Sequence, residues 1–100
     1  TKQLTHREEA RLTDSIMQTE KKCFITGAET WLDLHHIYAG PNRKHSDAWG
    51  CWVWLRHDIH MRLHDEDKEL DKMLKRICQE RFEELHGHEK FMDIFGKSYL

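Results

Sequence analysis

The sequence lacks the features that mark several common protein classes. It has three cysteines, Cys23, Cys51 and Cys78, and no C-x-x-C pair, so neither a disulfide scaffold nor a cysteine-rich structural zinc site is expected. No apolar run approaches the roughly 18 residues of a membrane-spanning helix. Its 16 basic residues are outnumbered by 18 acidic ones, for a net charge of −2. We therefore expect a reducing, cytoplasmic setting and no membrane partner, and any phosphate-binding surface must be local.

A chain of 100 residues has the size of one small domain, and we treat residues 1–100 as a single domain. Thr5 and Glu8 form a T-x-x-E capping box, which predicts an N-terminal helix over residues 5–20. The apolar stripe of this helix is thin. It suits a few docking contacts, or an interface for a protein partner or a second copy of the chain.

The middle of the chain has the pattern of two strands joined by a loop. Two apolar runs, residues 31–38 and 51–55, predict the strands. The intervening residues 39–50 hold the single proline together with glycine and asparagine, which predicts an irregular loop. Trp52 and Trp54 alternate with smaller apolar residues, so both should lie on one face of the second strand.

Helical periodicity follows the second strand. Apolar residues recur at helical spacing over residues 67–85, and a shorter helix is predicted over residues 88–95. The fold class is therefore α+β. We expect a central ββα unit over residues 23–64, flanked by the N-terminal helix and by C-terminal helices over residues 67–100.

Histidine is the compositional outlier, with nine residues. His60 and His64 are four residues apart on a predicted helix, so they share one face and can chelate one ion. His35 and His36 lie towards the end of the first predicted strand, where adjacent side chains point to opposite sides, so one of the two can complete the ligand set. Asp33 lies on the same strand face as His35. It is placed either to orient a histidine through a hydrogen bond or to face solvent.

Four segments follow one another in order: Leu34-His35-His36-Ile37, a loop with glycine and asparagine, Val53-Trp54-Leu55, and His60-x-x-x-His64. Together they resemble the HNH, or ββα-metal, endonuclease family, and small phage-encoded members in particular. The resemblance implies that His35, His60 and His64 bind one divalent cation. It also implies that His36 is the general base in the hydrolysis of phosphodiester bonds, with DNA as the expected substrate.

The resemblance further implies Mg²⁺ or Mn²⁺ as the working ion, and three imidazoles also suit Zn²⁺ or Ni²⁺. The chain departs from the family at two places. Cys23 lacks the C-x-x-C partner that many members use for structural zinc, and Cys51 stands where the family's middle asparagine usually lies. Asn42 is the asparagine in the loop. Either Asn42 is a catalytic-site residue that takes over the role of fixing the loop around His36, or that role is absent from this chain.

Local basic residues are the expected nucleic-acid contacts: Arg43, Lys44, Arg56 and Arg62. Trp49 is the tryptophan best suited to stack on a base. Two other functions remain open. One is a catalytically weak or inactive metal-binding module that serves as a phage structural or partner-binding protein. The other is an interaction domain that binds no metal and uses its N-terminal helix and tryptophans for protein contacts.

Overall fold

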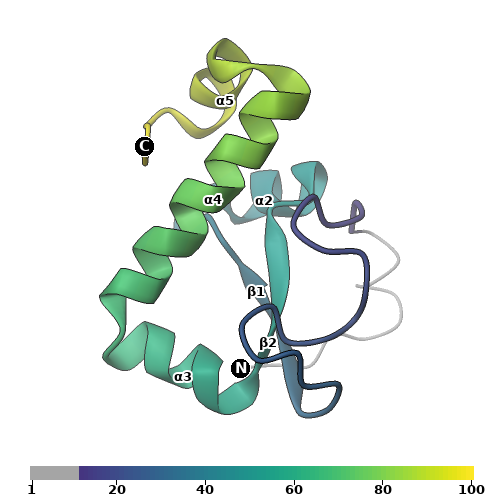
Figure 1. Cartoon of the computed structure of the whole chain (residues 1–100). Coiled ribbons are helices and arrows are strands. Elements are labelled where there is room, and N and C mark those ends of the chain that lie inside the picture. Colours follow the sequence, from purple (N-terminus) through teal and green to yellow (C-terminus); the bar gives the residue numbers. More distant parts are fainter. Residues whose placement is uncertain (1–11) are drawn as a thin grey trace.

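The computed structural model describes residues 12–100, which form a two-stranded antiparallel hairpin accompanied by four α-helices (Figure 1). In chain order the elements are β1 (Leu32–His36), a 3-10 turn η1 (Gly40–Asn42), α2 (Arg43–Trp49), β2 (Trp52–Arg56), α3 (His57–Asp65), α4 (Lys68–His86) and α5 (His88–Phe95). This order confirms the predicted α+β class, the central ββα arrangement and both C-terminal helices. Within the described range no helix has the length and apolar character needed to cross a membrane.

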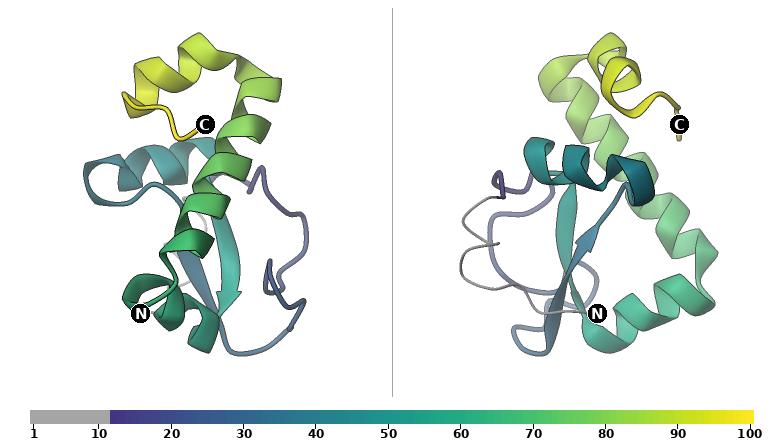
Figure 2. Two further views of the ribbon diagram at one scale, coloured as in Figure 1. Left: turned by 60° about the vertical axis from the view of Figure 1, so that its left-hand side comes forward. Right: turned by 180° about the vertical axis from the view of Figure 1, so that it is seen from behind.

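The hairpin is the centre of the fold. Its register pairs Leu32 with Arg56, His35 with Val53 and His36 with Trp52. The strands alternate as the sequence predicts: Val53 is fully buried, while the Trp52 and Trp54 rings meet edge to face with centroids 5.6 Å apart. Helices α3 and α4 lie on one side of the hairpin and the N-terminal segment on the other (Figure 2).

The connection between the strands corrects one prediction. Residues 39–50 were expected to form an irregular loop, but they form η1 and α2. Proline at the start of η1 has the backbone angle that a helical turn requires, and Gly50 ends α2 in the left-handed conformation. Ser46 is the one buried residue of α2, so the sequence shows almost no apolar face from which this helix could be predicted.

The N-terminal segment corrects a second prediction. Residues 12–20 contain no helix, whereas residues 5–11 of the predicted helix lie outside the described part of the chain. The segment follows the hairpin as an extended strap: the Ile16 amide donates to the Gly50 carbonyl (3.0 Å), and the Ser15 hydroxyl donates to the Trp52 carbonyl (2.6 Å). Polar side chains of this segment hydrogen-bond to backbone groups of the hairpin, which explains why the segment is polar although it is not a helix.

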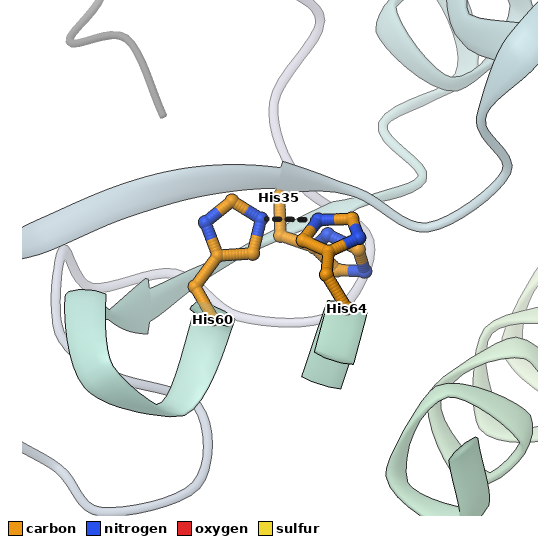
Figure 3. Close-up of side chains that lie close together, drawn as sticks. All are labelled: His35, His60 and His64. Carbon is orange, nitrogen blue, oxygen red and sulfur yellow. Dashed lines mark hydrogen bonds between the residues drawn. The ribbon is translucent and has the colours of Figure 1, made fainter. Parts of the chain in front are cut away.

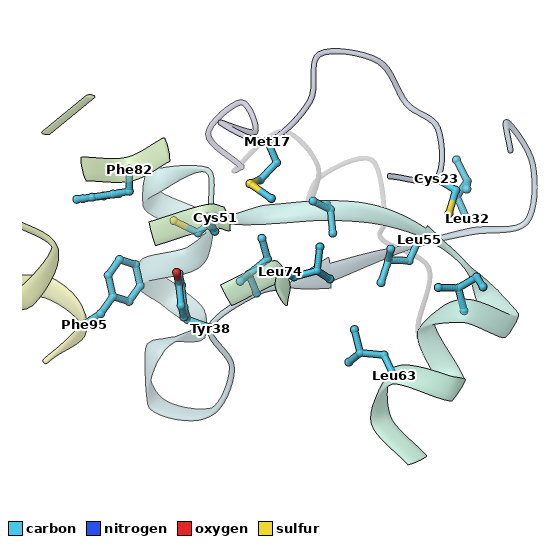
Figure 4. Packing of buried hydrophobic residues seen from close by; sticks show 14 of the residues in the cluster. Met17, Cys23, Leu32, Tyr38, Cys51, Leu55, Leu63, Leu74, Phe82 and Phe95 are labelled. Atoms are coloured by element: carbon cyan, nitrogen blue, oxygen red, sulfur yellow. The ribbon is translucent and has the colours of Figure 1, made fainter. Parts of the chain in front are cut away.

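The helices enclose the main core against the hairpin (Figure 4). Tyr38 is 1% exposed, and its hydroxyl donates to the Lys75 carbonyl of α4 (2.7 Å). Its ring packs against Phe91 and Phe95, with centroids 5.5 and 4.6 Å away. This contact fixes the chain just after β1 against both C-terminal helices.

We expect Gly50→Ala to destabilise the fold more than Gly40→Ala. Both glycines have positive φ angles, +72° and +62°, so alanine is strained at either site. A Cβ at Gly50 would also collide with the backbone carbonyl of Asp14, whereas a Cβ at Gly40 meets nothing within 4 Å. The collision should add about 1–3 kcal/mol to the loss of unfolding free energy in urea titrations. Equal losses for the two variants would show that the strap does not hold this position.

Candidate metal centre

Three histidine side chains meet where β1 passes α3 (Figure 3). One ring nitrogen from each of His35, His60 and His64 lies within 4.8 Å of the other two. The Nε2 atoms of His60 and His64 are 3.1 Å apart. Two nitrogens bound at right angles to one ion, each at about 2.1 Å, would be separated by about 3.0 Å. The three histidines predicted as ligands are therefore close enough to hold one metal ion.

The local fold brings these residues together because α3 begins directly after β2. The first amide of α3, at His57, donates to the carbonyl of Trp31 just before β1 (2.8 Å). One helical turn then carries the chain to His60, and a second turn to His64, both next to the ring of His35. The centroid of the His35 ring lies 5.0 Å from that of His60 and 5.7 Å from that of His64.

Asp33 orients His60, the middle histidine of the cluster. Its carboxylate lies 3.1 Å from Nδ1 of His60 and 2.8 Å from Nδ1 of His57. A proton on Nδ1 of His60 that is donated to Asp33 leaves Nε2 as the nitrogen with a free electron pair, which faces His64. Of the two readings left open for Asp33, the structure supports the buried acceptor, since the residue is 6% exposed. His57, at the start of α3, shares the same carboxylate.

The electrostatics of the cluster suit a cation. Burial, followed by the neighbouring His60, lowers the pKa of His35 to about 3, so this imidazole is neutral at neutral pH. Burial also lowers the pKa of His60. The Nε2 atom of His35 is buried and has no hydrogen-bond partner among the described residues. A buried, unpaired nitrogen is costly on its own, and coordination of a metal would satisfy it. The residues therefore fit the ion that the sequence predicts.

His36 lies outside the cluster, as expected for the residue adjacent to His35 on a strand. Its Nε2 is 2.6 Å from the carboxylate of Asp47 on α2. The pKa of His36 lies below its usual value because burial outweighs the effect of that carboxylate. Asp47 is not predictable from the sequence, because residues 39–50 have the pattern of a loop and nothing in that pattern indicates that residue 47 returns to the end of β1.

The loop after His36 is fixed by Ser46 rather than by Asn42. The buried hydroxyl of Ser46 donates to the Tyr38 carbonyl (2.8 Å) and accepts from the Tyr38 amide (3.1 Å). The side chain of Asn42 donates instead to the carbonyl of Phe95 at the end of α5 (3.4 Å). Asn42 thus ties η1 to the C-terminal helix, and its catalytic role stays a prediction.

The predicted phosphate contacts differ in their surroundings. Arg43 and Lys44 are exposed in the first turn of α2, and Arg62 is exposed on α3. Arg56 forms a bidentate ion pair with Asp58, with nitrogen–oxygen distances of 2.6 and 2.7 Å. Contact of these four residues with nucleic acid stays a prediction, and Arg56 would have to share its guanidinium with Asp58.

Cys23 is held by the fold without a second cysteine nearby in sequence. It is 2% exposed, and its sulfur accepts a hydrogen bond from the Thr26 amide (3.4 Å). Thr26 stands where a C-x-x-C partner would lie. Hydrogen bonding and packing therefore stabilise the turn that precedes β1.

We predict that the chain binds one Ni²⁺ or Zn²⁺ ion, and that His64→Ala abolishes most of this affinity. The variant removes one of three ligands from the exposed edge of the cluster, so the fold should persist. Isothermal titration calorimetry measures stoichiometry and affinity. His88→Ala is the matched control, because His88 is exposed and pairs with Glu83 away from the cluster. Equal affinities in the two variants would place the ion elsewhere.

Asp33→Asn should weaken metal binding by about 10–100-fold, the usual effect of losing the group that orients a histidine ligand. The amide retains the shape of the carboxylate but not its charge. Asp58→Asn is the control for charge, because Asp58 pairs with Arg56 at the surface. If both variants bind as the wild type does, Asp33 does not orient the ligand.

The comparisons with known proteins provide no family assignment: no family model matches the sequence, and no curated protein or solved structure matches it either.

Proposed function

We propose that the protein is a metal-dependent endonuclease of the HNH type that hydrolyses phosphodiester bonds in DNA. The observation that carries the proposal is the arrangement along β1. His35 joins the cluster with His60 and His64, while the adjacent His36 lies outside it and pairs with Asp47. A cation site and a separately held base on neighbouring residues are the two components that single-metal hydrolysis of a phosphodiester requires.

The ion would supply positive charge for the phosphate and for the leaving 3′-oxygen. His35, His60 and His64 would hold it, and Asp33 would keep His60 in the tautomer that binds. Mg²⁺ or Mn²⁺ is the proposed working ion, and Zn²⁺ or Ni²⁺ should bind the three imidazoles more tightly.

His36 would act as the general base. Its Nε2 faces Asp47, so a proton on Nε2 leaves Nδ1 free to accept the proton of the attacking water. The carboxylate of Asp47 would then stabilise the imidazolium that forms. Ser46 holds the backbone after His36, which limits the movement of this base.

A second candidate is a metal-binding module without nuclease activity, such as a phage structural or partner-binding protein. Two observations favour it: Asn42 contacts Phe95, and Arg56 is already paired with Asp58. Both leave fewer groups to receive a substrate.

The cytoplasmic location predicted from the unpaired cysteines also remains a proposal.

We predict that His36→Ala lowers DNA cleavage by about 10²–10⁴-fold, the usual contribution of a general base, and leaves metal affinity unchanged. Asp47→Asn should lower cleavage by less, because the base remains. The assay follows supercoiled plasmid with Mg²⁺, Mn²⁺ or EDTA, with His88→Ala as the control.

Two outcomes would contradict this assignment. If His36→Ala loses the metal while His35→Ala retains it, the two roles are reversed. If the wild type binds metal but cleaves no DNA under any of these conditions, the second candidate function is correct.

A further inference from the structure

Trp31 combines two unusual features. Its side chain is 62% exposed, and its backbone has a φ of +58°, which no other non-glycine residue in the described part of the chain shares in sign. A bulky residue is strained in this left-handed region, so the surrounding structure must hold it there. A hydrogen bond holds the backbone there: the Trp31 carbonyl accepts from the His57 amide (2.8 Å).

The indole is fixed relative to the metal centre. Its ring packs against the imidazole of His57, with centroids 5.1 Å apart and planes inclined by 39°. His57 contacts Asp33, and the same carboxylate contacts the metal ligand His60. Three consecutive side-chain contacts therefore connect an exposed aromatic surface to the cluster.

The fold engages the other three tryptophans more fully. Trp52 is only 9% exposed. The ammonium of Lys21 lies 4.6 Å from the ring centroid of Trp54. Trp49, the stacking candidate favoured by the sequence, packs edge to face against Phe82, with centroids 5.6 Å apart. Each of these indoles serves the packing of the protein, whereas most of Trp31 faces solvent.

The charge near Trp31 favours a base over a phosphate. Arg56 pairs with Leu32 across the hairpin, one residue from Trp31, but its guanidinium is occupied by Asp58. The chain as a whole has a net charge of −2. Stacking on an indole needs no positive charge, and it accepts any base because every base has a π-face.

We propose that Trp31, backed by His57, is a stacking platform for an unpaired nucleobase. This inference rests on the proposed nuclease function, and it specifies the substrate: a strand that presents a single-stranded or flipped-out base beside the metal centre. The packing of the indole against His57 keeps it in place before the nucleic acid binds, so little ordering is required on binding.

The test measures binding of a fluorescent single-stranded oligothymidine by anisotropy in EDTA, so neither metal binding nor cleavage affects the result. Trp31→Asn removes the indole, and asparagine tolerates the left-handed backbone. It should weaken binding by about 5–150-fold, the range that loss of one stacked base produces. Trp31→Phe should restore most of the affinity. Leu85→Asn is the matched control, because Leu85 is also 62% exposed but lies at the end of α4.

An abasic strand with the same number of phosphates separates stacking from charge. Wild type should bind it as weakly as Trp31→Asn binds oligothymidine, and the salt dependence should be the same for both proteins, because no phosphate contact is lost. Equal binding of oligothymidine by wild type and Trp31→Asn would overturn the inference. So would self-association through Trp31 without oligonucleotide binding. Trp31-dependent binding without any plasmid cleavage would instead support the platform and reject the nuclease.

Discussion

The buried carboxylate of Asp33 is the constraint on which the site depends. Asp33 is 6% exposed, and its carboxylate lies within hydrogen-bond distance of two imidazole nitrogens from the first turn of α3, those of His57 and His60. A buried carboxylate is stable only when hydrogen bonds or opposite charge replace the water it has lost. These two imidazoles come from one helix, so their contacts with Asp33 fix the rotation of α3 against β1. That rotation also places His60 and His64 next to His35.

The alternation of a β-strand then divides the chemistry. Asp33 and His35 lie two residues apart and contact residues of α3, whereas His36 contacts Asp47 on α2. One short strand thus separates a cluster suited to a cation from an imidazole suited to proton transfer. Beyond the strand, the hydrogen bonds of Tyr38 and Ser46 anchor the chain that follows His36.

Periodicity made much of this arrangement predictable. The spacing of His60 and His64 and the pair at His35-His36 place candidate ligands on one helix face and one strand face, and the structure brings His35, His60 and His64 close enough to hold one ion. The apolar stripe of α4 was equally clear. Helix α2 escaped prediction because its one buried residue, Ser46, is polar. The contacts of Asp47 with β1 and the exposure of Trp31 depend on tertiary placement. The T-x-x-E pattern predicted a helix over residues 5–20, yet residues 12–20 pack along the hairpin without one.

X-ray absorption spectroscopy of the zinc-loaded protein tests the central claim most directly, because it identifies the atoms around the metal. We predict three imidazole nitrogens at about 2.0–2.1 Å, completed by oxygen ligands, and one imidazole fewer in His35→Ala. Sulfur at about 2.3 Å, the distance of a cysteine ligand, would contradict it. A spectrum unchanged by His35→Ala would contradict it as well, since the ion would then lie outside the cluster of His35, His60 and His64.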